Sequence, residues 1–495
     1  MNEVRTMTDD GSSTVERAPF FIKGKLVDGE DLVHRSRDLG VNFSTPTLDL
    51  NAIITPRSET VPLADVKLSE IIDFLAETGE RLALASNPYI EACVERMALT
   101  NVLPVRVIRN QMGVGAEMLR KRHLIEVAEQ NFSDPKALDE WVPRTDSNGR
   151  ESYVRACPPR LVHVLPGNAA VAAVQTIAWS AMVKAANLFK MGSSDPFTAV
   201  AILRTMADID PEHPVVKSMS AVYWRGGDET IERVLYRPQF FDKVVAWGGG
   251  DAIENVAKYV GPGFQLVSFD PKTSISMIGR EAFASEEALG DAAERAASDV
   301  TLLNQEACVC SRIIFIEGEA AEVDGFCARL LDRIVLDRDA ASAEAPPLDR
   351  SLQEEIEALE LMGGDFRVWG LGGGKGLVIR SQEPVDFHPI NKTANVVRVK
   401  SLADALQYVN VATQTVGVFP YDRAFALRDG LASGGAQRIT RLGECEGVSA
   451  GSPHDATYPL HRMVHWVVHE DGGSAAGLNA PLAPSEEGGL HAAPS

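Results

Sequence analysis

The most constraining feature of this chain is the stretch from residue 161 to residue 269, where short apolar runs alternate with helical segments and glycine-rich turns. Each run is bounded by Gly, Pro or polar turn residues and is too short for a helix, so each one predicts a buried strand. Alternation at this rhythm is typical of βαβ units, whose strands pair in parallel with helices on both faces of the sheet. We therefore predict an α/β fold built on a doubly wound parallel sheet. The predicted strands are Leu161–Leu165, Asn187–Lys190, Ala221–Trp224, Val244–Trp247 and Gln265–Phe269.

The loops that follow these strands hold residues suited to a nucleotide cofactor. In a parallel sheet they meet at the carboxyl edge, where nucleotides bind. Asn168 offers an amide after the first strand, while Lys190, Ser193 and Ser194 offer a cation and hydroxyls ahead of a helix start. The turn Gly248–Gly250 lets backbone approach a ligand closely after the fourth strand. Each feature alone is more often a turn residue or a solvated lysine, so only their combination predicts a binding site.

A turn with two cysteines lies between a predicted helix over 282–303 and the apolar strand Ile313–Ile316. Cys308 follows the polar residues 304–306, and a thiol is suited to carry an acyl group as a thioester. Most free cysteines are small buried apolar residues, and the turn alone favours that interpretation. Cys310 is a second candidate nucleophile in the same turn.

The amino-acid composition limits which classes of partner and which cellular compartment we expect. The 495 residues are 45% hydrophobic, enough for two or three domains, and the net charge of −21 argues against nucleic acid or an anionic membrane surface as the main partner. The six cysteines are sparse and lack metal-site spacing, so we expect no metal, reduced thiols and a cytoplasmic protein. No secretory segment is evident near the start, and the apolar stretch 171–189 contains Gln175 and Lys184, so it predicts a buried helix rather than a membrane span.

The same reading divides the chain into segments. We expect disorder over 1–15, an N-terminal region with an NAD(P)-binding Rossmann-like domain over 16–270, a catalytic domain with the cysteine over 271–450, a C-terminal strand segment over 451–470 and a disordered tail over 471–495. Within these segments the patterns predict helices over 63–97 and 110–132, a polar surface connection over 138–157, and a strand over 454–469. We also expect Asp195 to cap a helix that has Pro196 at its first position.

The order and spacing of these motifs resemble the aldehyde dehydrogenase superfamily and, within it, the luminescence-type (LuxC) fatty acyl-CoA reductase family. The matching segments are VLPGN (164–168), FKMGSSDPF (189–197), VVAWGGGDAI (244–253), FDPKTSIS (269–276), NQEAC (304–308), NVVRV (395–399) and GSPHDATYPLHRMVHW (451–466). The resemblance implies an aldehyde-dehydrogenase-like fold with a second α/β catalytic domain and Cys308 as nucleophile. It also implies that Asn168, with a backbone N–H at Cys308, stabilises the oxyanion. Lys190 and Ser193 would bind the adenosine ribose or its 2′-phosphate, and the backbone of the 248–250 turn would come close to the cofactor.

One departure from the oxidising members of the superfamily sets the expected direction of reaction. They place a water-activating glutamate four residues before the lysine equivalent to Lys272, and this chain has Ser268 there. An acyl-enzyme would then survive to react with hydride or with another thiol. We therefore predict NADPH-dependent reduction of a fatty acyl thioester, carried by CoA, a carrier or another protein, to the aldehyde. A serine near Lys190 leaves room for the 2′-phosphate, whereas NADH would be favoured if Asp195 faced the ribose.

Rival functions and partners stay open at this point. An NAD(P)-dependent aldehyde dehydrogenase working in the oxidising direction, a cysteine acyltransferase without hydride transfer, and a non-catalytic scaffold all share parts of the pattern. Asp270, Ala456, His465 and the segment 310–312 depart from the family motifs and leave the substrate undefined. A lone histidine is more often structural than ligand-binding, so His454 and His461 are only candidate site residues. The resemblance implies an acyl-protein synthetase partner and a homo-oligomer built through the stretch 454–469.

Overall fold

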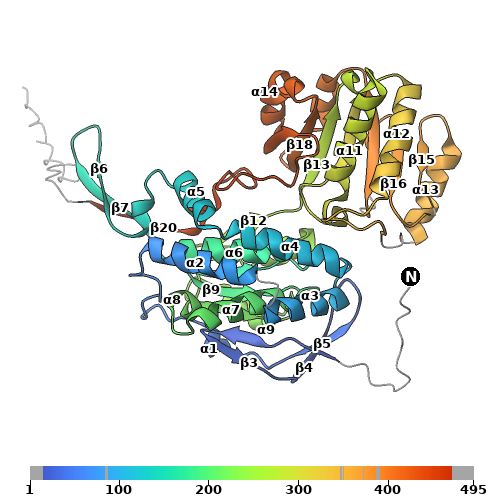
Figure 1. The fold of residues 1–495 in the computed structure, drawn as a ribbon. Helices are drawn as coiled ribbons and strands as arrows, with labels where there is room; N and C mark the ends of the chain where they lie inside the picture. Colours follow the sequence, from blue (N-terminus) through green and yellow to red (C-terminus); the bar gives the residue numbers. More distant parts are fainter. Residues whose placement is uncertain are drawn as a thin grey trace, which may run out of the picture.

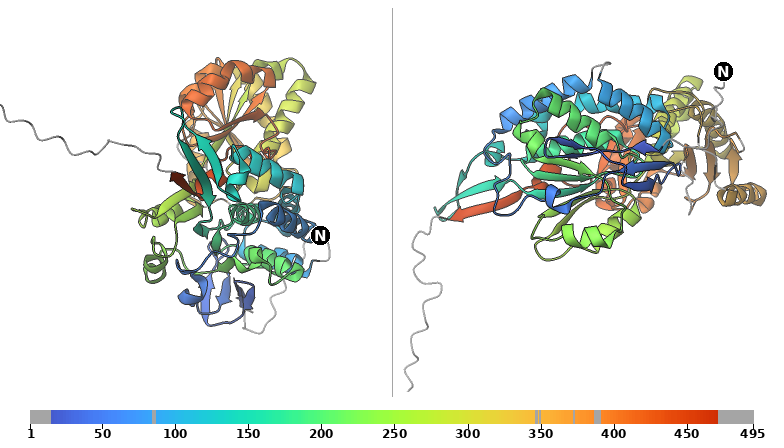
Figure 2. Two further views of the ribbon diagram at one scale, coloured as in Figure 1. Left: turned by 90° about the vertical axis from the view of Figure 1, so that its left-hand side faces the viewer. Right: turned by 90° about the horizontal axis from the view of Figure 1, so that it is seen from below.

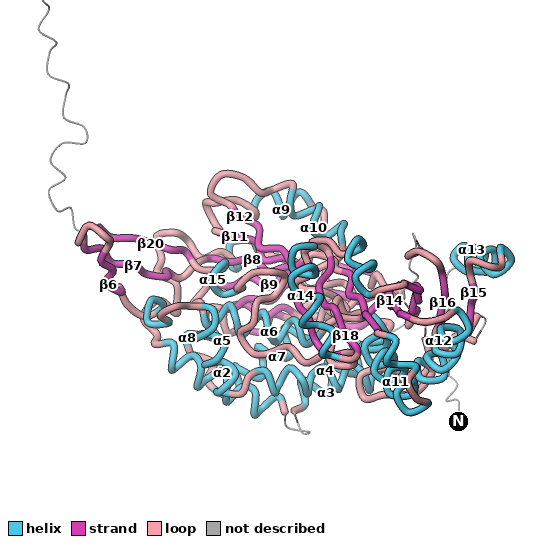
Figure 3. The backbone as a smooth tube through the Cα atoms, turned by 90° about the horizontal axis from the view of Figure 1, so that it is seen from above, coloured by secondary structure: helices cyan, strands magenta, loops and turns pink. Residues whose placement is uncertain are grey.

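The computed structural model describes residues 15–470 apart from 84–86, 346–347, 349, 372 and 386–390. The predicted disordered ends, 1–15 and 471–495, therefore lie outside the described residues except for Val15. Figure 1 shows two lobes and a projecting arm: a lobe drawn mainly in blue and green, a second lobe in yellow and orange, and an arm formed by β6, β7 and β20. Figure 3 places the arm at one end of the molecule and the second lobe at the other.

The first lobe is built on a seven-stranded sheet in the order β12-β11-β8-β9-β10-β2-β3. The strands β8 to β12 all pair in parallel, while β2 pairs antiparallel with β10 and with β3. The strand order grows one way from β8 to β10 and the other way from β8 to β12, which confirms the predicted doubly wound sheet. The bounds are β2 (Phe20–Ile22), β3 (Lys25–Val27), β8 (Arg160–Val164), β9 (Ala186–Lys190), β10 (Met219–Val222), β11 (Lys243–Trp247) and β12 (Gln265–Phe269).

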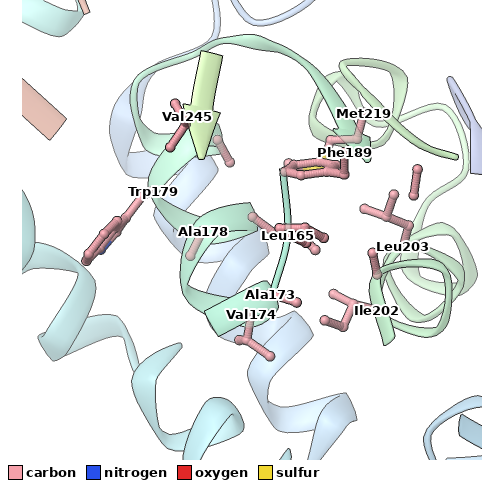
Figure 4. Close-up of a cluster of buried hydrophobic side chains, with 14 of the residues drawn as sticks. Leu165, Ala173, Val174, Ala178, Trp179, Phe189, Ile202, Leu203, Met219 and Val245 are labelled. Carbon is pink, nitrogen blue, oxygen red and sulfur yellow. The ribbon is translucent and has the colours of Figure 1, made fainter. Parts of the chain in front are cut away.

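The central helix of this lobe is α6 (Ala170–Met182), which is apolar on nearly every side and therefore buried. Figure 4 shows its side chains, including Ala173 and Trp179, in a core with Leu165 after β8 and Phe189 of β9. The other helices of the lobe are α1 (Leu50–Ile53), α2 (Leu68–Leu82), α3 (Pro88–Thr100), α4 (Val105–Met118), α5 (Lys121–Asn131), α7 (Thr198–Ile209), α8 (Pro214–Lys217), α9 (Glu229–Leu235) and α10 (Gly250–Ala257). A small sheet of β1 (Glu16–Arg17), β5 (Asn42–Thr45) and β4 (Leu32–Arg35) completes it.

The second lobe repeats the same architecture with a seven-stranded sheet in the order β15-β16-β17-β14-β13-β18-β19, parallel except for β15. Its strands are β13 (Thr273–Ile278), β14 (Ser311–Glu317), β15 (Arg367–Trp369), β16 (Leu377–Ser381), β17 (Thr393–Val399), β18 (Thr413–Phe419) and β19 (Arg438–Arg441). Its helices are α11 (Glu286–Thr301), α12 (Ala320–Ile334), α13 (Arg350–Met362) and α14 (Ala424–Gly434). The two sheets separate close to residue 271, and the assignment of an independent domain to each one stays a prediction.

The arm is an antiparallel three-stranded sheet in the order β20-β7-β6. Figure 2 shows the C-terminal strand β20 (His465–Glu470) beside β7 (Glu151–Cys157), with β6 (Val142–Thr145) on the far side of β7. The polar connection predicted over 138–157 is therefore wrong, because this polar stretch forms a hairpin that faces solvent. The strand predicted over 454–469 is wrong in its first half: a turn and the short helix α15 (Pro459–Met463) come before β20.

The predicted helices need two further corrections. The stretches 63–97 and 110–132 each contain a break, because α2 and α3 are separate helices and so are α4 and α5. Helix α7 begins at Thr198 rather than at Pro196, although the Asp195 carboxylate does cap it by accepting the N–H groups of Phe197 and Thr198. Within the described residues, no helix combines the length and the apolar character that crossing a membrane requires.

Candidate active site

The cysteine turn is held by backbone in an unusual conformation and by one buried glutamine. After α11, the residues Leu303, Asn304 and Gln305 all have positive φ, which non-glycine residues rarely adopt. The Gln305 side chain is fully buried, donates to the carbonyls of Ser311 and Thr393, and accepts from the Thr393 N–H. These three bonds tie the turn to β14 and β17, and they fix where Cys308 lies.

Replacing Gln305 with alanine should lower the free energy of unfolding by about 3 kcal/mol, because three buried backbone groups lose their partner. Thermal or denaturant unfolding measures this change. The exposed Gln407, which makes a single bond to the Asp404 carbonyl, supplies a matched glutamine-to-alanine control with an effect below about 1 kcal/mol. Equal effects at the two positions would show that the Gln305 bonds do not hold the turn.

Cys308 lies half-buried where this turn meets β13 and β18. Ser274 at the start of β13 donates to the Cys308 carbonyl at 2.8 Å, and the Gln414 side chain from β18 hydrogen-bonds the sulfur. Burial raises the pKa of the Cys308 thiol, the Gln414 bond lowers it, and the negative charge of Asp455 raises it again. Backbone bonds from the N–H groups of Cys308 and Val309 lower the pKa further without reversing the net shift. The resting thiol is therefore protonated at neutral pH.

Cys310, the second predicted nucleophile, is placed in the protein interior. Its side chain is fully buried, and its sulfur donates to the Leu302 carbonyl at 3.0 Å. Burial raises the pKa of the Cys310 thiol far above its ordinary value. The sulfur of Cys310 is thus closed off from any substrate, which leaves Cys308 as the accessible thiol of the turn.

Asn168 lies next to the cysteine turn although the two are far apart in sequence. Its amide Nδ2 donates to the Glu306 carbonyl at 3.3 Å and to the Glu306 carboxylate at 3.0 Å. The loop that carries it touches the loop after β9, since a Cβ at Gly192 would lie only 2.9 Å from the Gly167 Cα. Glycine is required at this contact, which brings the loops after β8 and β9 together at the carboxyl edge of the sheet.

A cavity of about 400 Å³ opens at the same edge and holds Lys190. Lys190 is 8% exposed, and its Nζ lies 5.8 Å and 5.7 Å from the ring centroids of Tyr223 and Trp224. None of the described residues is seen to accept a hydrogen bond from this ammonium. Burial lowers the pKa of Lys190 to about 8, while the charge of Glu232 raises it. The residues that line the cavity are Val164, Lys190, Gly226, Gly227, Glu232, Tyr236, Asp251, Ala252, Asn255, Val256 and Lys258.

Glu232 is a residue of this cavity that sequence reasoning missed. It is 1% exposed on α9, and its carboxylate accepts from the Trp224 indole, the Gly227 N–H and the Asn255 amide. These three donors satisfy the carboxylate oxygens and hold the loop after β10 against α10. In the sequence, Glu232 is an ordinary glutamate within the short stretch that forms α9. It belongs to no local motif, so sequence patterns alone could not have identified it.

The other predicted cofactor residues lie around the cavity rather than along its wall. Gly248 and Gly249 directly precede α10, whose first residue is Gly250 and whose next residues line the cavity. Ser193 is half-buried in the loop after β9, and the Ser194 hydroxyl oxygen accepts from the Asp38 N–H. Ser194 thus serves a structural contact in this structure.

The C-terminal segment adds residues to the cysteine side of the site. Asp455 accepts from the Gln414 amide at 2.9 Å, and the His454 ring packs against Trp179, Trp247 and Phe269. His461, in contrast, packs on Phe132 and Trp466 beside the arm. Within the described residues, no group of His, Cys, Asp and Glu side chains is arranged to hold a metal ion.

This architecture is that of an aldehyde dehydrogenase. A salicylaldehyde dehydrogenase from Pseudomonas putida G7 superposes with a TM-score of 0.71 at 15% identity, covering 93% of this chain and 99% of that chain. An NADP-dependent glyceraldehyde-3-phosphate dehydrogenase from Bacillus halodurans C-125, solved with NADP, gives a TM-score of 0.70 at 15% identity, covering 92% and 99%. These likenesses confirm the predicted fold.

The family is narrower than the fold. The model of the acyl-CoA reductase (LuxC) family matches residues 63–466, and the chain belongs to this family. A long-chain acyl-protein thioester reductase of Vibrio harveyi is 28% identical over 464 residues, 91% of this chain and 93% of that protein. The protein of the same name from Photorhabdus luminescens is 30% identical over 478 residues, covering 92% and 93%. Membership confirms the resemblance and the oxidoreductase class predicted from the sequence.

Proposed function

We propose that this protein reduces a fatty acyl thioester to the aldehyde with NADPH, through an acyl-enzyme on Cys308. The observation that carries the proposal is the position of Cys308: an accessible thiol at the end of a tied turn, beside the amide-bearing loop of Asn168. The related long-chain acyl-protein thioester reductases are named for the same reaction type.

The first step forms the acyl-enzyme. The sulfur of Cys308 attacks the thioester carbonyl, and the carbonyl oxygen becomes an oxyanion. Asn168 Nδ2 and the Cys308 backbone N–H donate to that oxygen, and one such donor is typically worth about 2.7–4 kcal/mol of transition-state stabilisation. Glu306 holds the Asn168 amide in the resting chain, so the substrate oxygen takes its place. Collapse of the oxyanion expels the carrier thiol.

The direction of the second step follows from the residue at position 268. Ser268 lies in β12, in the position where oxidising relatives place a glutamate that activates water. A serine hydroxyl activates water far less well than a carboxylate does, so we expect hydrolysis of the thioester to be slow. The acyl-enzyme would then persist, and a nicotinamide cofactor would supply the hydride that reduces it.

The cavity around Lys190 suits the adenosine ribose of a nicotinamide dinucleotide. A buried ammonium with no acceptor among the described residues needs an anionic or hydroxyl partner, and a ribose 2′-phosphate supplies both. Glu232 is already occupied by three donors and does not pair with Lys190, while Lys258 adds a second cation to the lining. Asp251 also lines the cavity and offsets Lys258 in charge, so the support for NADPH over NADH comes from the Lys190 ammonium itself. Asp195 caps α7 instead of facing the cavity, which supports the same choice.

The affinity for NADPH should fall as the pH rises above 8, because Lys190 loses its proton there. The lysine is charged below its pKa of about 8, so binding is full at pH 7 and about tenfold weaker at pH 9. Quenching of intrinsic fluorescence by NADPH measures the dissociation constant. Lys190→Met should bind weakly with no such pH dependence, whereas the exposed Lys400→Met should behave like the parent protein. A flat profile in the parent protein would remove Lys190 from the cofactor site.

The reaction itself is tested by following NADPH absorbance with acyl-CoA substrates of several chain lengths, and NADP⁺ with the corresponding aldehydes. Consumption of NADPH that depends on the thioester, with aldehyde as product, supports the proposal. Aldehyde oxidation without CoA would favour the oxidising dehydrogenase. Acyl transfer without NADPH consumption would favour the acyltransferase, and no reaction with any thioester would favour the scaffold.

The partners of the reaction belong to the same proposal. Because the relatives are named for acyl-protein thioesters, we expect an acylated protein, such as an acyl-protein synthetase subunit, as well as acyl-CoA to serve as acyl donor. We also propose that the protein forms a homo-oligomer through the arm and that it is cytoplasmic. The exposed Trp466 and Val468 on β20 give the arm an apolar edge suited to such an assembly.

A further inference from the structure

We infer that Asp455 is the residue that exchanges a proton with the Cys308 thiol while the acyl-enzyme forms. This inference rests on the proposed function. It assigns the carboxylate that accepts the proton of the Cys308 thiol and later returns it. Gln414 provides the geometric reason. Its amide donates to Asp455 Oδ1 at 2.9 Å, and the next residue, Thr415, donates its N–H to the Ser274 hydroxyl, which in turn donates to the Cys308 carbonyl. The start of β18 therefore brings the Asp455 carboxylate to the cysteine turn.

The charge of Asp455 explains why it would act as a base. Burial and the Asp455 carboxylate both raise the pKa of Cys308, so the site does not store a thiolate before the substrate arrives. The proton must then leave as the sulfur attacks, and an adjacent carboxylate is suited to accept it during bond formation. Asp455 itself is largely buried, with its side chain 7% exposed, which shields this exchange from bulk water.

The surroundings of Asp455 contain further polar atoms without partners. His454 Nε2 lies 3.9 Å from Asp455 Oδ1, and burial lowers the pKa of His454, so its ring is neutral. Arg438 is the other charged group that acts on this histidine. Among the described residues, His454 Nε2 and the Gln414 oxygen are buried with no hydrogen-bond partner. Buried polar atoms are nearly always paired, so these two atoms beside Asp455 leave hydrogen-bonding capacity that the described residues do not use.

Glu306 is the rival carboxylate, since it lies two residues before Cys308. Its carboxylate is engaged with the Asn168 amide, the proposed oxyanion donor, rather than with the sulfur. The influence of Asp455 on the thiol is also direct, as a charge that raises the pKa of Cys308. Position 268, where oxidising relatives carry their base, offers only a serine. Asp455 is therefore the carboxylate best placed to serve the sulfur.

The step balances without any further reactant. The Cys308 sulfur forms a bond to the acyl carbon while its proton passes to Asp455. The bond between the acyl carbon and the carrier sulfur breaks, and the leaving thiolate takes the proton from Asp455. Nothing is oxidised or reduced, and Asp455 ends the transfer as the carboxylate it was at the start.

Asp455→Asn in the full-length chain separates this role from simple electrostatics. The residue has φ of 47°, in the left-handed region that asparagine tolerates, so the variant is suited to keep the fold. Mass spectrometry measures two rates at Cys308: alkylation by iodoacetamide over a range of pH, and acylation by a long-chain acyl-CoA. Loss of the carboxylate should make alkylation at pH 7 faster, because the thiolate is easier to form. Acylation should become about 10²-fold slower or more, because the leaving thiolate has no acid to protonate it.

Matched variants decide between the alternatives. Asp455→Glu should restore part of the acylation rate, and loss of the exposed charge in Glu446→Gln should change neither rate. The inference is overturned if both rates rise or both stay unchanged in Asp455→Asn, or if Glu306→Gln gives the expected pattern and Asp455→Asn does not. A parent protein that is alkylated at Cys308 but not acylated by acyl-CoA or by an acyl-N-acetylcysteamine overturns the proposed function itself, and this inference with it.

Discussion

Cys308→Ala is expected to abolish both acylation of the protein by acyl-CoA and thioester-dependent consumption of NADPH, while Cys310→Ala keeps both. The two thiols stand two positions apart, yet one is half-buried beside Gln414 and the other is fully buried against the Leu302 carbonyl. Covalent carriage of the acyl group needs a thiol, and alanine cannot supply one, so no residual acyl-enzyme should form. Mass spectrometry after incubation with acyl-CoA reports the acylated residue directly.

Cys310→Ala is the matched control and has its own measurable effect. Removing a fully buried sulfur and its bond to Leu302 should lower the free energy of unfolding by about 1–2 kcal/mol without changing the mass of the acylated peptide. The assignment fails if Cys310→Ala loses the acyl group while Cys308→Ala retains it. NADPH binding should be unchanged in both variants, because neither cysteine lines the Lys190 cavity.

The parallel sheet of the first lobe could be predicted from the sequence because its strands are buried on both faces. The run Val244–Trp247 in β11 is a continuous buried apolar segment followed directly by glycine, which is a local signal. The cysteine turn was also local: a helix end, polar residues and an apolar strand. Both features depend on residues adjacent in sequence, which is the information that a pattern along one chain contains.

The incorrect secondary-structure predictions concern segments whose contacts are distant in sequence. The hairpin of β6 and β7 is polar because it lies away from both cores, so its strands lack the apolar pattern by which strands are recognised, and its partner β20 lies about three hundred residues later. The segment 454–469 carried an alternating pattern, but the turn and α15 occupy its first half because it must cross from the second lobe to the arm.

For the same reason, only part of the candidate site could be predicted from the sequence. Asn168, Lys190 and Cys308 each belong to a motif, whereas Glu232, Gln414 and Asp455 acquire a role only through contacts made by folding. Gln414 is an unremarkable polar residue in the β18 sequence, and its significance comes from the meeting of β18, the cysteine turn and the C-terminal segment. The individual roles of the motif residues stay predictions, which a substitution at each position tests.

Asn168→Ala should reduce kcat and kcat/KM for thioester reduction by a similar factor of about 10²–10³. The amide would donate to an oxygen that is negatively charged only in the transition state, so its loss should leave substrate binding nearly unchanged. The resting contact with Glu306 sharpens this expectation. The Asn168 amide already donates to the Glu306 carboxylate, so exchanging that partner for a neutral thioester oxygen yields little binding free energy. An oxyanion, in contrast, would form a charge-assisted hydrogen bond with the amide.

Steady-state kinetics with one acyl-CoA and saturating NADPH distinguish the roles that Asn168 could have. The exposed Asn148→Ala, in the turn of the arm hairpin, is the matched control and should leave all constants unchanged. A rise in KM with constant kcat would make Asn168 a binding residue. No change in either constant would mean that the backbone N–H at Cys308 stabilises the oxyanion alone, and that the amide serves only to hold Glu306 beside the nucleophile turn.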